Sequence, residues 1–494
     1  MISAHLLVLQ VVLPLLAAPT CLVLARRPLP WLIAATVSWA SFGIAILLLH
    51  RVLTFGTFSY ELGGWAAPWG IEYRIDPLNA LVLLIVAGIS SVVVLFAKCS
   101  VEHELDPNKS HLFYSVWLLC LTGLLGIAAT ADAFNLFVFL EISSLSSYVL
   151  ISLAQQRRAL TAAFQYLIMG TIGATFLLIG IGLLYAMTGT LNMADLSQRI
   201  PAVSSTRTVA AAFVFITVGV GIKAAIFPLH YWLPNAYCHA PSAVTAFFAG
   251  TTTKVAVYVL LRFAFTVFGA EISLGQFLLN YFLLPLGIAA ALIGSTVAIF
   301  QRNVKRMLGY SSVAQIGYMV IGIGIASSMG LSATVLHLFN HAVIKTALFL
   351  SLGCIFYRLG SVSLTDLAGV GRTMPWTMAA FVIGGFSVIG LPLTVGFISK
   401  WYLVLAALEK QWWGLVGVIL VSSLLSIVYI WRVVEAAYFN AKPTANDTIG
   451  EAPASLLIPT WVLIAANIYF GVDTRLTVKL AELVSSTVLG VSPP

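Results

Sequence analysis

Five ionisable side chains lie inside long apolar stretches of this sequence. Glu141 lies in Phe137-Val-Phe-Leu-Glu-Ile-Ser-Ser-Leu-Ser-Ser147, and the other four are Lys223, Lys254, Lys345 and Lys400. An apolar environment disfavours a lone charge, and a carboxylate beside a lysine restores the charged form of that lysine. A Glu–Lys contact that forms and breaks would therefore switch the lysine between holding and releasing a proton. The chemistry that these residues predict is proton transfer.

A second group of titratable residues follows a helical period. His337, His341 and Lys345 recur every four residues and share one face of a helix, with Asn340 beside them. A single core histidine would be an ordinary hydrogen-bonding group, whereas three titratable groups on one stripe favour a hydrated proton path. A lysine beside the histidines would repel a metal ion. We therefore expect no metal site here, and the five scattered cysteines do not provide one.

Two further groups each have two interpretations. The serines after Glu141 would either hold water near the carboxylate or only pack helices: they are Ser143, Ser144, Ser146 and Ser147. His230, two residues after Pro228, would be either a proton relay or a cap on a helix end.

The composition defines the class of protein. Of 494 residues, 60% are hydrophobic and only 9% are charged, and the mean hydropathy is +1.02. A soluble domain is about 25% charged, and a chain this apolar could not cover a soluble surface. Soluble enzymes, nucleic-acid binders and disordered proteins are therefore excluded. The net charge of +8 is interpreted as a topology signal.

Apolar runs of about 20 residues predict an all-α polytopic membrane protein with about 14 transmembrane helices. Their ranges are 4–25, 30–52, 77–97, 111–131, 133–153, 161–188, 208–227, 241–267, 277–299, 305–327, 332–357, 376–407, 411–437 and 454–474. Lysine and arginine in alternate loops number 13 on one side, including Lys305 and Arg306, and 8 on the other, including Arg262, Arg475 and Lys479. The positive-inside rule makes the first side cytoplasmic and places both termini outside.

Prolines interrupt two of these predicted helices. Pro228 breaks the one near residue 227, and Pro392 breaks the one near residue 391. Two such breaks about 165 residues apart favour an internal duplication, with a transport site at the breaks. We expect one membrane domain over residues 1–494: N-terminal helices and an external hairpin in 1–110, five-helix units in 111–267 and 277–437, and a C-terminal helix at 454–474. The alternation of Ile71, Tyr73 and Ile75 with polar residues after Gly63-Gly64 predicts the hairpin.

At membrane depth each charge costs about 2.5–3.5 kcal/mol on insertion scales. An interpretation without transport assigns each charge to a helix–helix ion pair or a snorkelling lysine. That interpretation is weaker for Glu141, Lys254 and Lys345, which lie mid-helix, and for Lys223 and Lys400, which lie beside the breaks.

The stretch Gly221-Ile-Lys-Ala-Ala-Ile-Phe-Pro-Leu-His-Tyr-Trp-Leu-Pro-Asn-Ala-Tyr-Cys-His-Ala-Pro-Ser-Ala-Val-Thr-Ala246 resembles the signature of the proton-translocating antiporter family. That family comprises antiporter-like subunits of respiratory complex I, large subunits of Mrp-type Na+/H+ antiporters, and relatives in membrane-bound hydrogenases. The resemblance is strongest over residues 70–440. Within the family the chain is most similar to the D subunit of Mrp-type antiporters, since Lys400 matches a lysine in the second broken helix. Among the complex I subunits, one branch has a glutamate at that position and another ends in a long lateral helix, so both fit this chain less well. A third branch is not excluded.

The resemblance implies roles for individual residues. Glu141 and Lys223 would be the family's ion pair, Lys254 the central relay and Lys400 the exit lysine. His337 and Lys345 match polar positions of the family's connecting helix, and His341 shares their stripe. The family has two inverted five-helix units, and its members work in complexes, so partner membrane subunits are implied. No cofactor and no nucleic acid are expected.

These observations leave three hypotheses. The first is a proton-translocating subunit of a multisubunit Na+/K+–proton antiporter in a prokaryotic cell (inner) membrane. The second is a proton-pumping membrane-arm subunit of an NADH:quinone oxidoreductase-like or hydrogenase-like complex, with no catalytic centre of its own. The third is a scaffold whose charges only pair helices, for which Glu141→Gln would leave transport intact.

Overall fold

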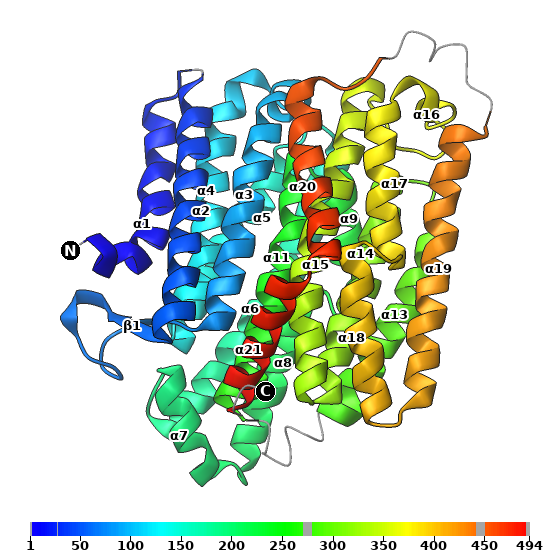
Figure 1. The fold of residues 1–494 in the computed structure, drawn as a ribbon. Coiled ribbons are helices and arrows are strands. Elements are labelled where there is room, and N and C mark those ends of the chain that lie inside the picture. The colour runs from blue at the N-terminus through cyan, green and yellow to red at the C-terminus, as the bar shows by residue number, and fades with distance from the viewer. Residues whose placement is uncertain (1, 27, 270–278, 441–449, 491–494) are drawn as a thin grey trace.

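The computed structural model describes residues 2–26, 28–269, 279–440 and 450–490. It is a bundle of helices with one small external hairpin (Figure 1). The predicted start of the second unit at 277 lies outside the described residues. The elements are α1 Ile2–Val23, α2 Leu29–Phe55, β1 Phe58–Glu61, β2 Glu72–Ile75, α3 Pro77–Glu104, α4 Ser110–Ala129, α5 Ala133–Ser152, α6 Arg157–Thr188, α7 Met193–Val203, α8 Arg207–Ala224, α9 Trp232–His239, α10 Ser242–Gly250, α11 Thr252–Leu261, the π-helices η3 Arg262–Val267 and η4 Leu279–Leu283, α13 Leu284–Ile299, α14 Val304–Ile325, α15 Ser328–Leu359, α16 Val370–Thr373, α17 Pro375–Ile389, α18 Val395–Glu409, α19 Trp413–Tyr438, α20 Ala454–Val472 and α21 Arg475–Leu489.

The predicted number of membrane spans is confirmed over the described residues. Thirteen helical segments are long and apolar enough to cross a membrane. The fourteenth predicted span is split into α17 and α18, which are each 15 residues long and so fall short of a full crossing alone. α15 is one of the longest helices, with 32 residues, and it lies in the middle of the bundle (Figure 1).

The predicted hairpin is also confirmed. β1 and β2 pair antiparallel, with Phe58 opposite Ile75 and Glu61 opposite Glu72. α3 begins directly after β2, because Asp76 accepts hydrogen bonds from the backbone N–H groups of Leu78 and Asn79. We call the end of the bundle that carries β1, β2 and α7 the hairpin end, and the other the opposite end (Figure 1).

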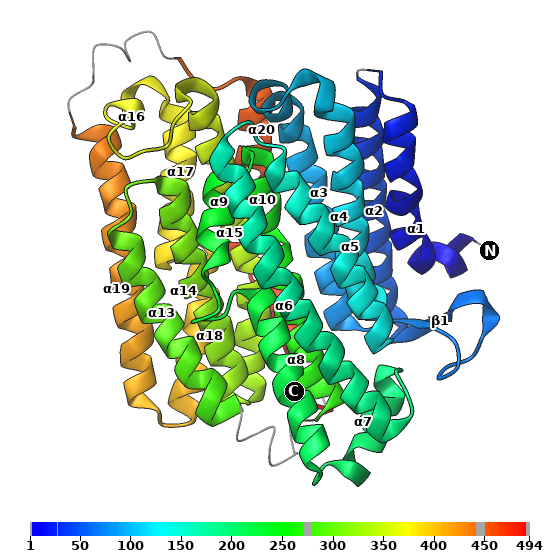
Figure 2. The ribbon, with the colours of Figure 1, turned by 180° about the vertical axis from the view of Figure 1, so that it is seen from behind.

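The two split segments are inverted relative to each other. α8 starts at the hairpin end, and α9 continues it toward the opposite end, whereas α17 and α18 run the other way (Figures 1 and 2). Pro228 lies in the seven-residue link between α8 and α9, and Pro392 lies in the link between α17 and α18. Each proline removes a backbone donor and releases carbonyl groups at membrane depth.

Glycine pairs allow the backbones to approach closely in each half. A Cβ on Gly219 of α8 would lie 2.5 Å from the carbonyl oxygen of Gly173 in α6. In the second half, a Cβ on Gly317 of α14 would lie 2.7 Å from the carbonyl oxygen of Gly287 in α13. Small residues at helix crossings are the usual way for membrane helices to associate.

Several basic residues that were counted with the loop charges lie in helices, and two of them are buried. Arg262 is buried in η3, and Lys305 is buried near the start of α14. Arg475 and Lys479 lie on an additional helix, α21, where no helix was predicted. α21 was not predicted because its 15 residues contain no apolar run long enough for a membrane span.

Candidate functional site

Lys223 lies in the last turn of α8, directly before the first break. Its Nζ donates to the Ser144 hydroxyl at 2.6 Å and to the Tyr148 hydroxyl at 3.3 Å, and both acceptors belong to α5. The negative end of the α8 dipole also favours a cation at this position. Lys223 is only 7% exposed, so its ammonium group is held by hydroxyl groups and by a helix end.

Glu141 lies one turn before Ser144 on α5 and is half-buried. Its buried Oε1 has no hydrogen-bond partner among the described residues. The ion pairs given for those residues join Asp195 to Arg199, Asp76 to Arg262 and Asp473 to Arg475, and Glu141 belongs to none of them. A carboxylate near the lysine but not bonded to it is compatible with a contact that opens and closes.

A small cavity adjoins Lys223. Its volume is about 30 Å³, and its polar lining comes from Ser143, Ser144, Ser147, Tyr166, Lys223 and Thr252. That volume matches one water molecule, and the lining offers more than the two to four polar partners that a buried water needs. The cavity therefore favours the water-holding interpretation for these serines. Thr252 brings it to the first turn of α11, two residues from Lys254.

Lys254 is fully buried after a kink between α10 and α11 at Thr251. Its Nζ donates to the carbonyl oxygen of Ala249, in the last turn of α10, and lies 3.4 Å from the Thr253 hydroxyl. The ammonium group is again at the C-terminal end of a short helix.

Lys400 repeats this arrangement at the second break. Its Nζ donates to the carbonyl oxygens of Val388 at 2.8 Å and Ile389 at 3.0 Å, and to the Ser423 hydroxyl at 3.0 Å. The two carbonyls are the last of α17, and the break leaves them without helical donors. The break thus creates the acceptors that hold the lysine. Lys254 and Lys400 thus both place their ammonium groups at a helix C-terminus, whereas that of Lys223 is bonded to hydroxyl groups of α5.

The predicted stripe on α15 lies in the protein interior. The rings of His337 and His341 lie parallel with centroids 5.8 Å apart, and Nδ1 of His337 is 2.8 Å from the Ser399 hydroxyl. Both ring nitrogens of His341 and Nε2 of His337 are buried without hydrogen-bond partners in the part of the chain that the structure describes. Ser399 directly precedes Lys400, and Thr346, next to Lys345, donates to the carbonyl of Ala246 in α10 at 3.4 Å. α15 therefore contacts the elements that carry both Lys254 and Lys400.

A chain of hydroxyl groups leads away from Lys345 and was not predicted. Nζ of Lys345 donates to Ser311 at 2.8 Å, whose hydroxyl is 2.8 Å from that of Tyr429. Tyr429 donates to Ser426 at 3.1 Å, and Ser426 donates to the carbonyl of Ser422. The Ser422 hydroxyl accepts from Tyr318 at 2.8 Å, and the ammonium of Lys400 lies 5.0 Å from the Tyr318 ring centroid. The spacing of Ser422, Ser426 and Tyr429 at one helical face was the available signal in the sequence.

His230 does not belong to the group formed by the buried lysines and the stripe on α15. Its ring stacks on Phe227 with centroids 5.3 Å apart and meets the edge of Tyr310 at 6.1 Å. Its Nδ1 is buried and finds no hydrogen-bond partner within the described ranges. The structure places His230 in the link after Pro228, where both of its interpretations stay open.

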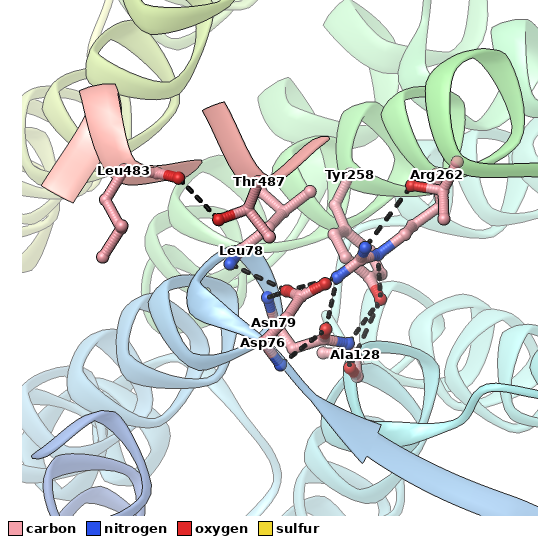
Figure 3. A network of polar contacts seen from close by, with 9 residues as sticks. Asp76, Leu78, Asn79, Ala128, Tyr258, Arg262, Leu483 and Thr487 are labelled. Atoms are coloured by element: carbon pink, nitrogen blue, oxygen red, sulfur yellow. Dashed lines mark hydrogen bonds and ion pairs between the residues drawn. The ribbon is translucent and has the colours of Figure 1, made fainter. Parts of the chain in front are cut away.

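A second buried charge network, also not predicted, lies near the hairpin end (Figure 3). Arg262 donates to Asp76 at 2.5 Å and also to Asn79 and Tyr258. Burial alone would raise the pKa of the Asp76 carboxyl, but Arg262 and two backbone N–H groups outweigh burial and hold the pKa below its ordinary value. Lys254, Tyr258 and Arg262 follow at four-residue intervals, so one face of this segment is polar along its length.

Polar cavities lie at both ends of the bundle. At the hairpin end, a cavity of about 190 Å³ is lined by Arg74, Asp76, Arg262 and Thr487 among others. At the opposite end, a cavity of about 380 Å³ is lined by Glu104, Arg158, His239 and Lys305 among others. Lys305 donates there to the Ser242 hydroxyl at 3.0 Å, at the start of α10. The buried lysines thus lie between two polar cavities.

Known proteins with a similar sequence are membrane subunits of two kinds of complex. A family model described as NADH:quinone oxidoreductase/Mrp antiporter, transmembrane region, matches residues 130–426. NADH-quinone oxidoreductase subunit N of Desulforudis audaxviator is 42% identical over 93% of this chain and 94% of its own. The D subunit of the Na(+)/H(+) antiporter of Alkalihalophilus pseudofirmus is 31% identical over 87% of this chain and 85% of its own.

Two solved structures contain a similar chain. In the Mrp complex from Dietzia sp. DQ12-45-1b, a chain superposes with a TM-score of 0.91 at 26% identity, covering 99% of this chain and 98% of that chain. In a membrane-bound sulfane sulfur reductase, described as an archaeal respiratory membrane complex, a chain superposes with a TM-score of 0.91 at 30% identity, covering 98% of both.

Proposed function

The chain belongs to the NADH:quinone oxidoreductase/Mrp antiporter transmembrane family, and we propose that it translocates protons as one membrane subunit of a larger complex. The observation that carries the proposal is a set of buried lysines held by carbonyl and hydroxyl groups instead of by carboxylates. Lys223, Lys254, Lys345 and Lys400 all have this environment. Ion pairing between helices, the alternative without transport, would need carboxylates bonded to them.

In the proposed mechanism the proton moves between neutral and charged lysines. Glu141 acts on Lys223: when the carboxylate approaches, the ammonium form is favoured, and when it withdraws the proton can leave. The hydroxyl-lined cavity at Thr252 supports water-mediated transfer from Lys223 toward Lys254. His341 and His337 then bridge to the second half, where hydroxyl groups lead from Lys345 through Ser311 and Tyr429 to Ser426, on the way toward Lys400.

What drives the protons is a separate question, and two answers have support. The matches to the D subunit of a Na(+)/H(+) antiporter and to a chain of an Mrp complex favour a Na+/K+–proton antiporter subunit. The 42% identity to the N subunit of an NADH-quinone oxidoreductase, and the chain of the sulfane sulfur reductase, favour a membrane-arm subunit of a redox-driven complex. In either case this chain would supply the proton path and a partner subunit the coupled step.

We also infer its placement in the membrane. The loop charges favour a prokaryotic cell membrane orientation in which the hairpin end faces outward, with both termini on that side. The units 111–267 and 277–437 would be the two inverted repeats. Membrane subunits of the same complex are the expected partners.

Inverted membrane vesicles that contain the complete complex test the proposal. Acidification of the vesicle interior by NADH or another electron donor would favour the redox-driven complex. Collapse of a preformed proton gradient by added Na+ or K+ would favour the antiporter. If Glu141→Gln and Lys223→Ala both left proton movement at the rate of the unaltered complex, the proposed path would be wrong.

A further inference from the structure

α21 has its polar side on the outside of the bundle. The face that packs inward is formed by Leu480, Ala481, Val484 and Val488. The outer side carries the exposed charges Arg475 and Lys479, the half-buried Glu482 and one exposed apolar residue, Leu476. α20 and α21 lie in front in Figure 1, and Figure 2 shows α5 and α6 on the opposite face of the bundle. α21 is therefore an amphipathic helix on a lateral surface, and two exposed charges on its outer side are unsuited to lipid.

The depth of this helix follows from its contacts. Gly471, at the end of α20, packs against the link between α17 and α18: a Cβ on it would lie 2.6 Å from the carbonyl oxygen of Leu393. That link is midway along a split membrane span. Ser485, ten residues after Arg475, bonds to Ser328 and Ser332 in the first turns of α15, at the hairpin end. Arg475 therefore lies about 15 Å from Ser485 along the helix, at 1.5 Å per residue, on the side toward the middle of the bundle.

The charges at this depth are held in place. Arg475 donates to Asp473 through Nε at 2.9 Å and through a second nitrogen at 2.8 Å, while the Arg475 side chain is 91% exposed. Asp473 is nearer to the middle of the span than Arg475. The ion pair thus holds the guanidinium group beside Asp473, whereas a snorkelling arginine extends freely toward water. Charges exposed to hydrocarbon in this way are unfavourable, so lipid is a poor covering for this face.

We propose that the outer face of α21 is an interface covered by a membrane helix of another subunit. This rests on the proposed function only in that the chain works within a complex. The charges of α21 indicate the chemistry of the partner. Asp473 already neutralises Arg475, whereas Lys479 has no ion pair among the described residues. The covering helix therefore presents a carboxylate to Lys479 and hydroxyl or small side chains to the rest of the face.

Cysteine labelling tests whether a helix of another subunit covers the outer face of α21. In the complete complex, reconstituted in lipid nanodiscs, Lys479→Cys is treated with a membrane-impermeant maleimide and, separately, with a lipid-soluble maleimide. Both rates should be at least about tenfold lower than after the subunits are separated in detergent, because a partner helix excludes both reagents. Ser59→Cys in the hairpin should react with the impermeant reagent in both states. The complex with the unaltered chain gives the background from its own five cysteines.

Two other labelling results would each contradict the proposed interface. Rapid reaction of the Lys479→Cys variant with the impermeant reagent in the complete complex would mean that α21 lines a water-filled crevice. Reaction with the lipid-soluble reagent alone would mean that lipid covers the face. Neither result depends on proton movement, so the interface and the proton path can fail separately.

Charge substitutions provide a second measurement. Lys479→Glu should reduce the other subunits that copurify with this chain to less than about a fifth, while Lys479→Arg should keep them, since only the first removes attraction to a carboxylate. Lys410→Glu, an exposed lysine between α18 and α19, is the matched control and should change nothing. Equal copurification with Lys479→Glu and Lys410→Glu would overturn the proposed charge pairing.

Discussion

The ammonium group of Lys223 donates to the hydroxyl of Ser144 at 2.6 Å, and the carboxylate of Glu141, one turn earlier on α5, forms no ion pair with any described residue. Lys223 is bonded to a hydroxyl group on the same helix that carries Glu141, and not to Glu141 itself. In this arrangement the lysine is satisfied without its carboxylate. A small side-chain movement would convert a hydroxyl-bonded lysine into an ion-paired one, which is the switch that proton transfer needs.

Glu141 and Lys223 should act as a unit in proton movement. Glu141→Gln keeps the shape of the side chain but removes its charge, and Lys223→Ala removes the group that it controls. We expect each to slow proton translocation at least about tenfold, and the double variant to be no slower than either single one, because residues in one step are not additive. The measurement is initial proton flux in proteoliposomes of the complete complex. Fully additive losses would contradict the coupling.

The chain of hydroxyl groups that leads from Lys345 toward Lys400 should depend on Tyr429. Tyr429→Phe removes the hydroxyl that bonds to Ser311 and Ser426 and leaves the ring. If the chain carries protons, flux should fall about threefold to tenfold, in the range of one positioned proton-transfer group or less. Tyr185→Phe, at a half-exposed tyrosine on α6, is the matched control. Unchanged flux with Tyr429→Phe would leave Lys400 without this route.

Breaking the buried pair of Arg262 and Asp76 should destabilise the protein. Arg262→Met leaves the Asp76 carboxylate buried without its partner, and such changes cost about 3–5 kcal/mol. The thermal unfolding midpoint of the purified protein should fall clearly. Arg199→Met breaks an exposed pair with Asp195, where about 1 kcal/mol or less is expected. Equal unfolding midpoints for the two variants would show that the buried network stabilises the protein no more than the exposed ion pair does.

The contact of α6 with α8 should not tolerate a larger residue at Gly219. Gly219→Ala would place a Cβ 2.5 Å from the backbone oxygen of Gly173, so the helices must separate. We expect a lower unfolding midpoint and reduced flux, because Lys223 lies one turn further along α8. Gly43→Ala on α2 has no described atom within 4 Å of the new Cβ. It should be neutral or slightly stabilising, since alanine favours a helix interior by up to about 1 kcal/mol over glycine.

Much of the fold followed from local sequence patterns. The spans, both breaks and the hairpin were predictable, because apolar runs, prolines and alternation are properties of consecutive residues. Arg262 was misassigned for the same reason: its partner Asp76 is 186 positions away in the chain. The hydroxyl chain from Lys345 was missed because its members come from α14, α15 and α19, and serines in membrane helices are common packing residues.

The sequence alone indicated about 14 membrane crossings and identified five charges inside apolar stretches, since composition and hydropathy need no knowledge of contacts. Only the tertiary structure decided which groups hold those charges. Carbonyl oxygens at the ends of α10 and α17 hold Lys254 and Lys400 in place of carboxylates. Whether the carbonyls freed by a helix break face a lysine depends on how the two helix segments are folded. The outward polarity of α21 was likewise decided by packing, because a helical pattern specifies an apolar face but not which side of the bundle covers it.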